Sequence, residues 1–355
     1  MTRTHLIISH QLTYNCMHLL IPYAASHADG CQTTLATLQL PNLQKLLSRL
    51  TAQPMDTGDE LSLSPPHERA LASLLGLPAL DGQIPWAAWQ AQKDPSLAAF
   101  GGAWSFVTLC HWQADKQQVS MRQIPMQDLP QAESDTLLEA MRPFFAEDGV
   151  TLYSDEPGRW LAHADVFQGL ATASSDRVLG RNLVTWMPDA AQASGLIRLI
   201  SEMQMLLYNH PVNDAREARG ALSINAIWLS GSGVLPGTQP DIGNAQLRTV
   251  QDQLAVVADR GSWSGVRHPM HPTVIPTLRD AALREDWSSW ASAWQTLDAT
   301  HIKGLLDAQT LGESVQLTLC GERHAQTWRT QPQALMQKIK HLFGTQPIHN
   351  MLKVL

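Results

Sequence analysis

The sequence has few charged side chains, and no sign of charge dominates it. Asp, Glu, Lys and Arg make up 16% of the 355 residues, against roughly 25% in an average soluble protein. The net charge is −7, whereas a protein that binds nucleic acid through its phosphates needs clustered basic residues. We therefore expect no nucleic-acid partner.

Cysteines are also scarce, and long hydrophobic runs are absent. Cys16, Cys31, Cys110 and Cys320 lie far apart and form no C-x-x-C pair, which excludes a disulfide framework and a cysteine zinc site. Two stretches without charge, 95–114 and 221–240, are interrupted by Gly, Pro, Ser or Gln and favour buried strands over membrane spans. We expect a cytoplasmic protein without a membrane partner.

Tryptophan is abundant, with 12 residues against 4 Tyr and 6 Phe, and helical and strand patterns alternate along the chain. A buried first strand is predicted at 17–22, which leaves 1–16 as an appendage outside the fold. The remaining apolar periodicity predicts strands over 104–110, 118–121, 223–230 and 314–320, and helices over 40–50, 68–75, 131–145, 195–208, 247–258, 286–297 and 332–343. This order is typical of an α/β protein.

The turn between the strongest predicted helix and the strongest predicted strand collects polar side chains. Residues 208–220 (YNHPVNDAREARG) bring His210, Asn213 and Arg216 together, and arginine can bind a phosphate or carboxylate through two parallel hydrogen bonds. The alternative is a capped loop with solvated arginines. Arg177 and Arg181, four residues apart, either clamp an anion or lie at the start of a helix.

Two glycines and two histidines give weaker patterns. Gly231-Ser-Gly233 follows a predicted strand, but without the further glycine of a dinucleotide fingerprint a tight turn is favoured. His268 and His271 have no carboxylate or third nitrogen ligand nearby in the sequence, so a metal site there is disfavoured.

Nucleophile candidates are His67 and Cys320. His67 begins a predicted helix, whose dipole favours a neutral imidazole, and it is a nucleophile, a ligand or a packing residue. Cys320, Glu322 and His324 alternate at the end of a predicted strand. Ordinary strand-end polarity is favoured there over a Cys–His pair.

One block resembles a known family. His210-Pro-Val-Asn213, Arg216 and Gly220, followed by Asn225-Ala-Ile-Trp228 and Gly231, resemble the archaeal-type cofactor-independent phosphoglycerate mutases of the alkaline phosphatase superfamily. Their pattern is close to H-P-V-N-x-x-R-x-x-x-G and A-N-x-I-W-x-x-G-x-G. Fainter similarity extends over 17–328, and the whole-chain pattern is similar to a bacterial group labelled RpfE-type regulatory proteins.

The resemblance implies an alkaline-phosphatase-like α/β fold, with a mixed-sheet core flanked by helices and an inserted smaller α+β domain. We expect the core in 17–95 and 205–345 and the inserted substrate-type domain in 96–204. It also implies a mutase that moves phosphate through a serine with two Mn or Zn ions. Together with the patterns above, it gives an expected anion- or substrate-binding set of Arg177, Arg181, His210, Asn213, Arg216 and Trp228.

The residues that this two-metal chemistry needs are missing from their expected positions. After the first strand the family has Asp-Gly, whereas this chain has Ile21-Pro22-Tyr23-Ala24, and His67 stands in place of the nucleophilic serine. No Asp-His or Gly-His dipeptide occurs anywhere. We therefore expect no metal ligands and no metal cofactor.

The resulting hypothesis is a regulatory or metabolite-binding pseudoenzyme. Its partner would be a small phosphorylated or carboxylate metabolite, or an unknown protein. One alternative is an active phosphotransferase in which His67 carries the phosphate without metals while Arg177, Arg181 and Arg216 neutralise it. The other is an interaction module that docks a partner on the tryptophans at 287, 290 and 294, although that spacing is more typical of a buried helix face.

Overall fold

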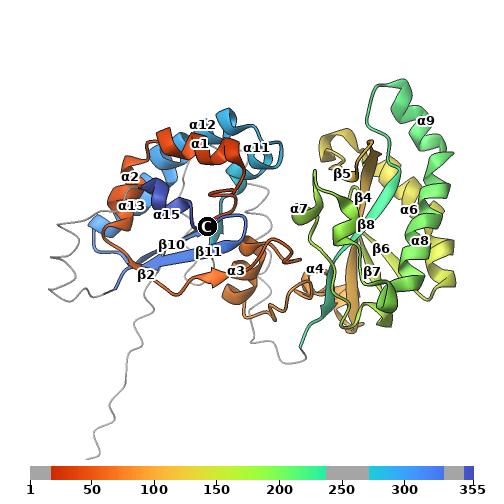
Figure 1. The fold of residues 1–355 in the computed structure, drawn as a ribbon. Helices are drawn as coiled ribbons and strands as arrows, with labels where there is room; N and C mark the ends of the chain where they lie inside the picture. The colour runs from red at the N-terminus through yellow and green to blue at the C-terminus, as the bar shows by residue number, and fades with distance from the viewer. Residues whose placement is uncertain (1–16, 237–271, 332–347) are drawn as a thin grey trace, which may run out of the picture.

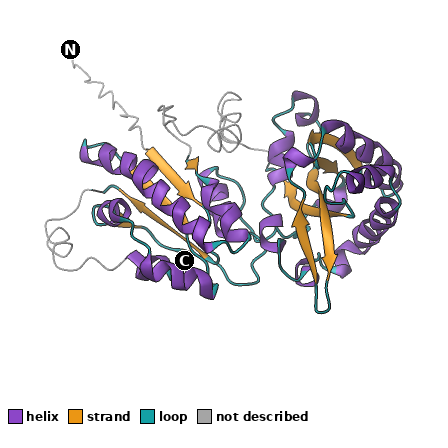
Figure 2. Ribbon diagram, turned by 90° about the horizontal axis from the view of Figure 1, so that it is seen from above, coloured by secondary structure: helices purple, strands orange, loops and turns teal. Residues whose placement is uncertain are grey.

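Two lobes, each built around its own β-sheet, make up the described part of the protein (Figure 1). The computed structural model describes residues 17–236, 272–331 and 348–355. The two lobes stand side by side in both views, and the first contains both the beginning and the end of the described chain (Figure 2). No helix in these ranges has the length and apolar character needed to cross a bilayer.

The first lobe contains a mixed sheet in the order β2-β11-β10-β1-β9, with β3 also paired to β11. Strand β1 is parallel to β10 and β9, whereas β11 is antiparallel to β10, β2 and β3. Because side chains alternate along a strand, Leu19 and Ile21 face one side and His18 and Leu20 the other. The strands are β1 (Met17–Ile21), β2 (Thr51–Ala52), β3 (Asp56–Thr57), β9 (Thr273–Val274), β10 (Val315–Cys320) and β11 (His324–Arg329).

Helices of the first lobe bury the Leu19 face of this sheet. Trp290 and Trp294 are fully buried there, and their indole nitrogens donate to the carbonyls of Tyr23 and Ala24 at 2.9 and 3.2 Å. The tryptophan stripe is therefore the buried face of a helix, as its spacing favoured, and Trp290 and Trp294, two of its three members, offer no docking surface. The helices are α1 (Asp29–Thr37), α2 (Pro41–Leu47), α12 (Trp287–Leu297), the π-helical turn η5 (Asp298–Ile302), α13 (Lys303–Thr310) and α15 (Ile348–Leu352).

The opposite face of the first sheet packs against α3 (Pro66–Leu74), where Ala70 and Leu71 meet Leu20 and Cys320. Two consecutive prolines, Pro65 and Pro66, precede and open α3, because proline is compatible with the first turn of a helix. From α3 the chain passes through α4 (Trp86–Ala91) and α5 (Pro95–Ala98) into the second lobe.

The second lobe is built on an antiparallel sheet in the order β5-β4-β7-β6, with β8 paired to β4. Helices α6 and α8 bury one face of it, and α4 packs on the other. The strands are β4 (Ala103–Ala114), β5 (Val119–Gln123), β6 (Thr151–Glu156), β7 (Arg159–His163) and β8 (Ala226–Val234). The helices are α6 (Gln131–Glu147), α7 (Ser175–Val178), α8 (Ala190–Tyr208) and α9 (Pro211–Ala218), with short 3-10 turns at η1 (Met126–Asp128), η2 (Asp165–Phe167) and η3 (Leu183–Trp186).

The chain returns to the first lobe by way of β9, η4 (Pro276–Leu278) and α11 (Arg279–Leu283). A mixed sheet flanked by helices, interrupted by an α+β unit, is the predicted fold class and is confirmed. The predicted return to the core at residue 205 is wrong: it falls inside α8, and β8 pairs with β4 in the second sheet because Ile227 and Leu229 bury against the α6 and α8 side. The predicted appendage 1–16 and the predicted helices 247–258 and 332–343 lie largely or wholly outside the described residues.

Candidate functional site

A cavity of about 370 Å³ lies between the two lobes. Leu20 and Pro22 at the carboxyl end of β1 line one side of it, and Phe106 and Ser230 of the second sheet line another. Carboxyl ends of parallel strands are where open α/β sheets bind ligands. The position and size suit a small-molecule site.

His67 forms the centre of the polar wall of this inter-lobe pocket. It stands in the first turn of α3, and its Nε2 lies 3.3 Å from Oδ2 of Asp176, a residue of α7 in the second lobe. Arg279, at the start of α11, donates from Nε to the two oxygens of Asp176 at 3.0 and 3.1 Å. Side chains from three separate segments therefore form one ion-paired cluster.

The charge state of this cluster follows from its burial and its partners. Burial alone would raise the pKa of Asp176, but the Arg279 guanidinium and His67 hold it well below its usual range. Asp176 is therefore ionised, and its carboxylate can accept a hydrogen bond from the N–H at Nε2 of His67. The other ring nitrogen, Nδ1, then carries the lone pair, so the pair can act as a general base or as a nucleophile.

Glu68 and Tyr23 complete the surroundings of His67. Burial raises the pKa of Glu68, which accepts hydrogen bonds from the Ser174 hydroxyl and, at 3.1 Å, from Trp86 Nε1. Tyr23 directly follows Pro22 with a φ of 56°, and its ring lies 5.4 Å from the His67 ring. A left-handed conformation in a bulky residue is strained and is found most often where function requires it.

The two divalent ions implied by the family resemblance do not fit this donor set. Two metals need several carboxylates and histidines with free oxygens and nitrogens, yet both oxygens of Asp176 already accept from Arg279. Glu68 is bonded to Ser174 and Trp86, and burial favours its protonated form. Among the described residues, no group of three or more His, Cys, Asp or Glu is arranged to hold an ion.

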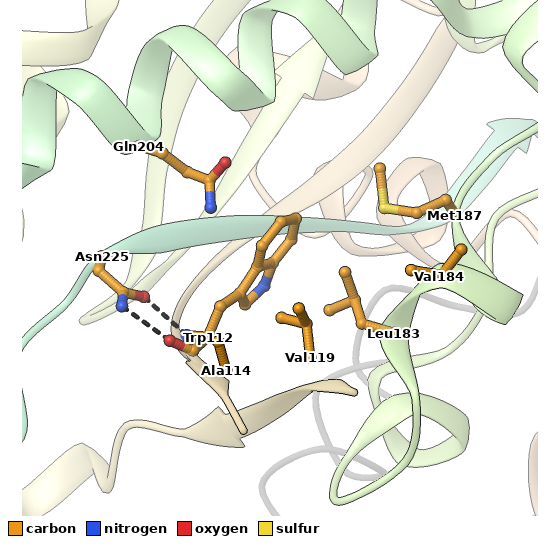
Figure 3. A pocket seen from close by; sticks show the side chains of 8 residues that line it. All are labelled: Trp112, Ala114, Val119, Leu183, Val184, Met187, Gln204 and Asn225. Atoms are coloured by element: carbon orange, nitrogen blue, oxygen red, sulfur yellow. Dashed lines mark hydrogen bonds between the residues drawn. The ribbon is translucent and has the colours of Figure 1, made fainter. Parts of the chain in front are cut away.

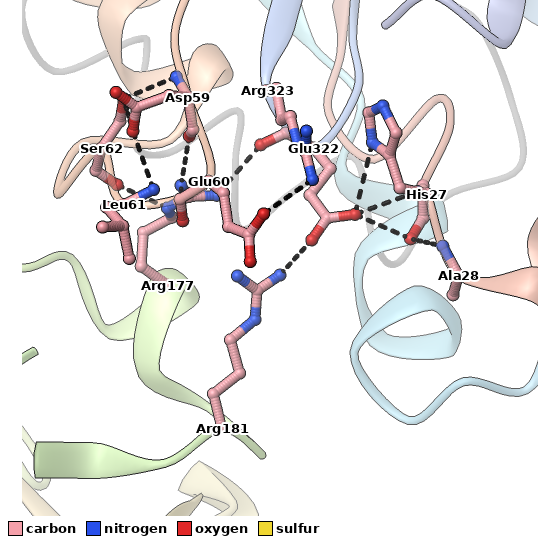
Figure 4. A network of polar contacts seen from close by, with 11 residues as sticks. His27, Ala28, Asp59, Glu60, Leu61, Ser62, Arg177, Arg181, Glu322 and Arg323 are labelled. Atoms are coloured by element: carbon pink, nitrogen blue, oxygen red, sulfur yellow. Dashed lines mark hydrogen bonds and ion pairs between the residues drawn. The ribbon is translucent and has the colours of Figure 1, made fainter. Parts of the chain in front are cut away.

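The Arg177 side chain does not line the inter-lobe pocket and instead forms hydrogen bonds between the two lobes (Figure 4). It is only 3% exposed. Its guanidinium donates to the carbonyls of Asp59, Glu60 and Ser62 at 2.9, 3.0 and 2.6 Å, and to that of Glu322 at 3.0 Å. The predicted anion clamp is wrong for Arg177 because backbone carbonyls of the first lobe use its donors.

Arg181 pairs with a carboxylate at the same contact. Its Nη2 lies 2.6 Å from Oε1 of Glu322, whose other oxygen accepts from the His27 backbone at 3.0 Å and from Ser26 (Figure 4). Burial would raise the pKa of Glu322, but the His27 backbone and Arg181 lower it on balance. The carboxylate of Glu322 therefore stands where an anionic ligand of Arg181 was expected.

The predicted site at His210, Asn213 and Arg216 is structural. His210 caps α9 by accepting from the Val212 amide at 3.2 Å, and Asn213 bonds the backbone of Leu207 and Ile224 at 2.8 and 2.7 Å. The prediction of an anion site in this turn is wrong because both side chains already serve the backbone. In Figure 1, α9 lies at the far end of the second lobe from α3.

Arg216 and Trp228 are buried away from any ligand. Arg216 has no exposed surface and pairs with Glu133 at 2.9 Å while donating to the carbonyls of Leu222 and Asp128. Trp228 is 1% exposed and donates to the Ala173 carbonyl at 2.9 Å. Neither side chain lines the inter-lobe pocket, so their anion-binding roles stay predictions without support from these contacts.

The remaining sequence candidates are dispersed. His324 accepts from the Gly58 amide at 3.3 Å, Cys320 is buried in the core, and His268 and His271 lie outside the described residues. The tight turn predicted at Gly231-Ser-Gly233 is wrong, because β8 continues to Val234 with an irregular register against β4. A Cβ on Gly231 would lie 3.0 Å from Trp86 Cβ. The absence of a side chain at Gly231 therefore allows β8 and α4 to approach closely at the pocket wall.

A second hollow, of about 460 Å³, opens on the second lobe (Figure 3). Trp112, Leu183, Val184 and Met187 supply its apolar wall, and the Asn225 amide is bonded to the backbone of Trp112 at 2.6 and 2.8 Å. None of the described residues that line it has an ionisable side chain. It offers no acid–base chemistry, so the inter-lobe pocket is the better candidate.

Sequence reasoning found His67 but missed the partners that define the site. Asp176 and Arg279 are 103 positions apart, and neither belongs to a motif. Asp176 precedes the more conspicuous Arg177, and only its contacts in the folded protein show that the carboxylate, not the arginine, faces His67.

Comparisons with known proteins add a distant structural likeness. No protein-family model matches the chain, and no curated protein does. Among solved structures, the cofactor-independent phosphoglycerate mutase of Thermoplasma acidophilum is similar, at 13% identity and a TM-score of 0.35 over 95% of this chain and 99% of that one. A protein of Pyrococcus horikoshii is similar at 12% identity and a TM-score of 0.41, over 91% and 90%. At this distance neither structure carries an argument about activity.

Proposed function

We propose that this chain binds a small anionic metabolite in the inter-lobe pocket and acts by binding, as a distant phosphoglycerate-mutase-like protein without two-metal phosphotransfer. The observation that carries the proposal is the cluster of His67, Asp176 and Arg279, in which the carboxylate is already neutralised. Such a cluster can orient polar donors toward a ligand, but its oxygens are not free for divalent ions.

The position of the pocket supports a regulatory role as part of this proposal. A ligand in it contacts α3 and β1 from one lobe and β4 and β8 from the other. A molecule that binds one relative orientation of two lobes better than another shifts the population toward it. Binding would therefore change the surface that the two lobes present to a partner.

Titration calorimetry on the full chain tests the proposal. The panel is 3-phosphoglycerate, 2-phosphoglycerate, lactate and phenylacetate, with and without Mn²⁺. We expect at least one of these anions to bind at one site per chain without Mn²⁺, and the Arg279→Gln variant to lose that binding. Arg142→Gln, which changes an exposed ion pair on α6, is the matched control.

The proposal fails if none of the four anions binds, or if binding is unchanged in Arg279→Gln. It also fails if binding requires stoichiometric Mn²⁺ and is accompanied by interconversion of the two phosphoglycerates. A 1:1 complex that depends on Arg279 and not on Mn²⁺ supports it.

Phosphate transfer to His67 is a second candidate, favoured by the orientation of that ring. With Nε2 directed at Asp176, the Nδ1 lone pair would attack the phosphorus of a donor. A P–N bond forms as the donor's P–O bond breaks, and the leaving oxygen takes the electron pair. The Nε2 proton stays on the ring, where the carboxylate of Asp176 stabilises the phosphorylated imidazolium.

Intact-protein mass spectrometry tests this second candidate. After incubation with 2,3-bisphosphoglycerate and no added metal, the wild type would gain one acid-labile phosphate, and His67→Gln would gain none. An unmodified wild-type mass removes the candidate and leaves the binding proposal in place.

A further inference from the structure

We infer that the inter-lobe pocket takes a ligand with a flat aromatic ring and no more than one negative charge, such as an aromatic carboxylate, in preference to a phosphorylated metabolite. This inference rests on the proposed function and specifies the ligand class of the same site. It follows from the composition of the pocket wall and from the pairing of the charges in it.

Aromatic side chains form much of the wall. Trp86 and Trp89 of α4 are packed edge to face, 6.0 Å apart, and Phe106 of β4 lines the same cavity. Leu71 and Val274 extend this apolar surface. An aromatic ring in contact with other rings gains roughly 0.5–1.5 kcal/mol beyond the area it buries, so a flat ring is bound better here than an open polar chain.

The cationic side chains in the described wall are already paired. Two arginines, Arg159 and Arg279, line the pocket. Arg279 is paired with Asp176, and Arg159 lies 2.8 Å from Asp155. No arginine of the described wall is left without an acidic partner.

A doubly charged phosphate needs unpaired cations or several free backbone amides. In this pocket it would have to compete with Asp176 and Asp155 for guanidinium groups that are already bonded, at sites shielded from water. A single carboxylate makes a smaller demand, because hydrogen bonds from one arginine edge are enough to pair it. The polar groups therefore suit a monoanion.

The polar and apolar parts of the wall lie on different elements. His67 and Arg279 stand at the starts of α3 and α11, whereas Trp86 and Phe106 come from α4 and the second sheet. A ligand with a charged group at one end and a ring at the other matches this division.

Calorimetric titration of the full chain with four probes tests the inference. The probes are phenylacetate, indole-3-acetate, cyclohexylacetate as a non-aromatic match, and 3-phosphoglycerate. We expect the two aromatic acids to bind at one site per chain, cyclohexylacetate about tenfold more weakly, from the ring–ring term, and 3-phosphoglycerate most weakly. Trp86→Leu, at a partly exposed position, should reduce the aromatic preference, and Trp112→Leu in the other hollow should not.

A second variant tests the pairing of the arginines directly. Asp176→Asn leaves the Arg279 guanidinium without its carboxylate partner. If that pairing is what disfavours 3-phosphoglycerate, the variant should bind 3-phosphoglycerate about tenfold more tightly or better. Retained near-ultraviolet dichroism would show that the variant is folded. If it is not, Asp155→Asn, which removes a carboxylate partner of Arg159, provides the corresponding test at the other arginine.

The outcomes separate this inference from the proposed function. Tighter binding of 3-phosphoglycerate than of the aromatic acids to the wild type, lost in Arg279→Gln, overturns the inference and keeps the proposed function. Equal binding of cyclohexylacetate and phenylacetate, or aromatic preference unchanged in Trp86→Leu, also overturns it. Binding of none of the probes would count against both.

Discussion

Protonation of His18 should weaken the sheet that positions the pocket. His18 lies on β1, four residues before Pro22, and it is 9% exposed. Its Nε2 is 2.8 Å from Thr318 Oγ1, which is in turn 2.8 Å from Thr327 Oγ1. Burial lowers the pKa of His18 from 6.5 to about 4, because a charged imidazole loses its hydration there.

The size of the effect follows from the two pKa values. The folded state binds a proton on His18 more weakly than the unfolded state does, so stability from this group is complete above pH 6.5 and is lost as the pH falls toward 4. The full loss is about 3 kcal/mol, at 1.36 kcal/mol per pKa unit. At about pH 5 the same relation gives a loss of roughly 2 kcal/mol. Glu68 acts in the opposite direction, since its raised pKa stabilises the fold at low pH.

Urea unfolding, followed by tryptophan fluorescence at about pH 5 and about pH 7.5, measures this loss in the wild type and in His18→Gln. Because all other titrating groups are shared, the difference between the two pH dependences isolates His18. We expect the wild type to lose about 2 kcal/mol more than the variant. An equal loss in both proteins, or an imidazole pKa near 6.5 by NMR titration, would refute the reasoning.

Three further predictions concern other buried groups. Replacing Arg177 with Met removes four hydrogen bonds between the lobes; it should cost about 3 kcal/mol or more in urea unfolding and raise the radius of gyration in solution scattering. Arg216→Met should cost roughly 3 kcal/mol while leaving the affinity of the inter-lobe pocket unchanged, since Arg216 bonds Glu133 and backbone carbonyls of the second lobe. A specific loss of ligand binding in the folded variant would restore it as an anion site. Burial raises the pKa of Cys31 to about 11 and that of Cys110 and Cys320 still further, so none of the three should react with iodoacetamide in the native protein by peptide mass mapping, whereas all should react in urea.

Periodicity predicted most of the helices and strands because each buries one face. The predicted helix 131–145 is α6 (Gln131–Glu147), and the predicted strand 314–320 is β10 (Val315–Cys320). The tryptophan stripe at 287–294 was also interpreted correctly as a buried face. Local patterns were sufficient there, because burial of a helix or strand depends on neighbours a few positions apart.

Sheet membership could not be predicted in the same way. The strand at 223–230 has the same apolar pattern whichever sheet it joins, and its pairing with β4 depends on residues more than a hundred positions away. The division into lobes therefore failed at residue 205, although the fold class was correct.

Polar motifs misled for a related reason. A short run such as His210-Pro-Val-Asn213 shows which groups can form hydrogen bonds but not with what, and here they bond the backbone of their own turn. Buried polar groups must be paired whether or not they have a function. Arg177 bonds four backbone carbonyls, and Arg216 bonds Glu133 and two carbonyls through Nε and Nη1. A conspicuous arginine was therefore weak evidence of an anion site.

The arginines that bond one lobe to the other also limit how the lobes can move when a ligand binds. Arg177 and Arg181 of the second lobe bond the segment around Glu322 in the first, and Arg279 of the first lobe bonds Asp176 of the second. The first pair of contacts lies outside the pocket, whereas Asp176 and Arg279 line it. A ligand in the pocket would add contacts between the lobes there and leave those of Arg177 and Arg181 in place, so we expect the response to binding to be a rotation about the Arg177 contact and not a separation of the lobes.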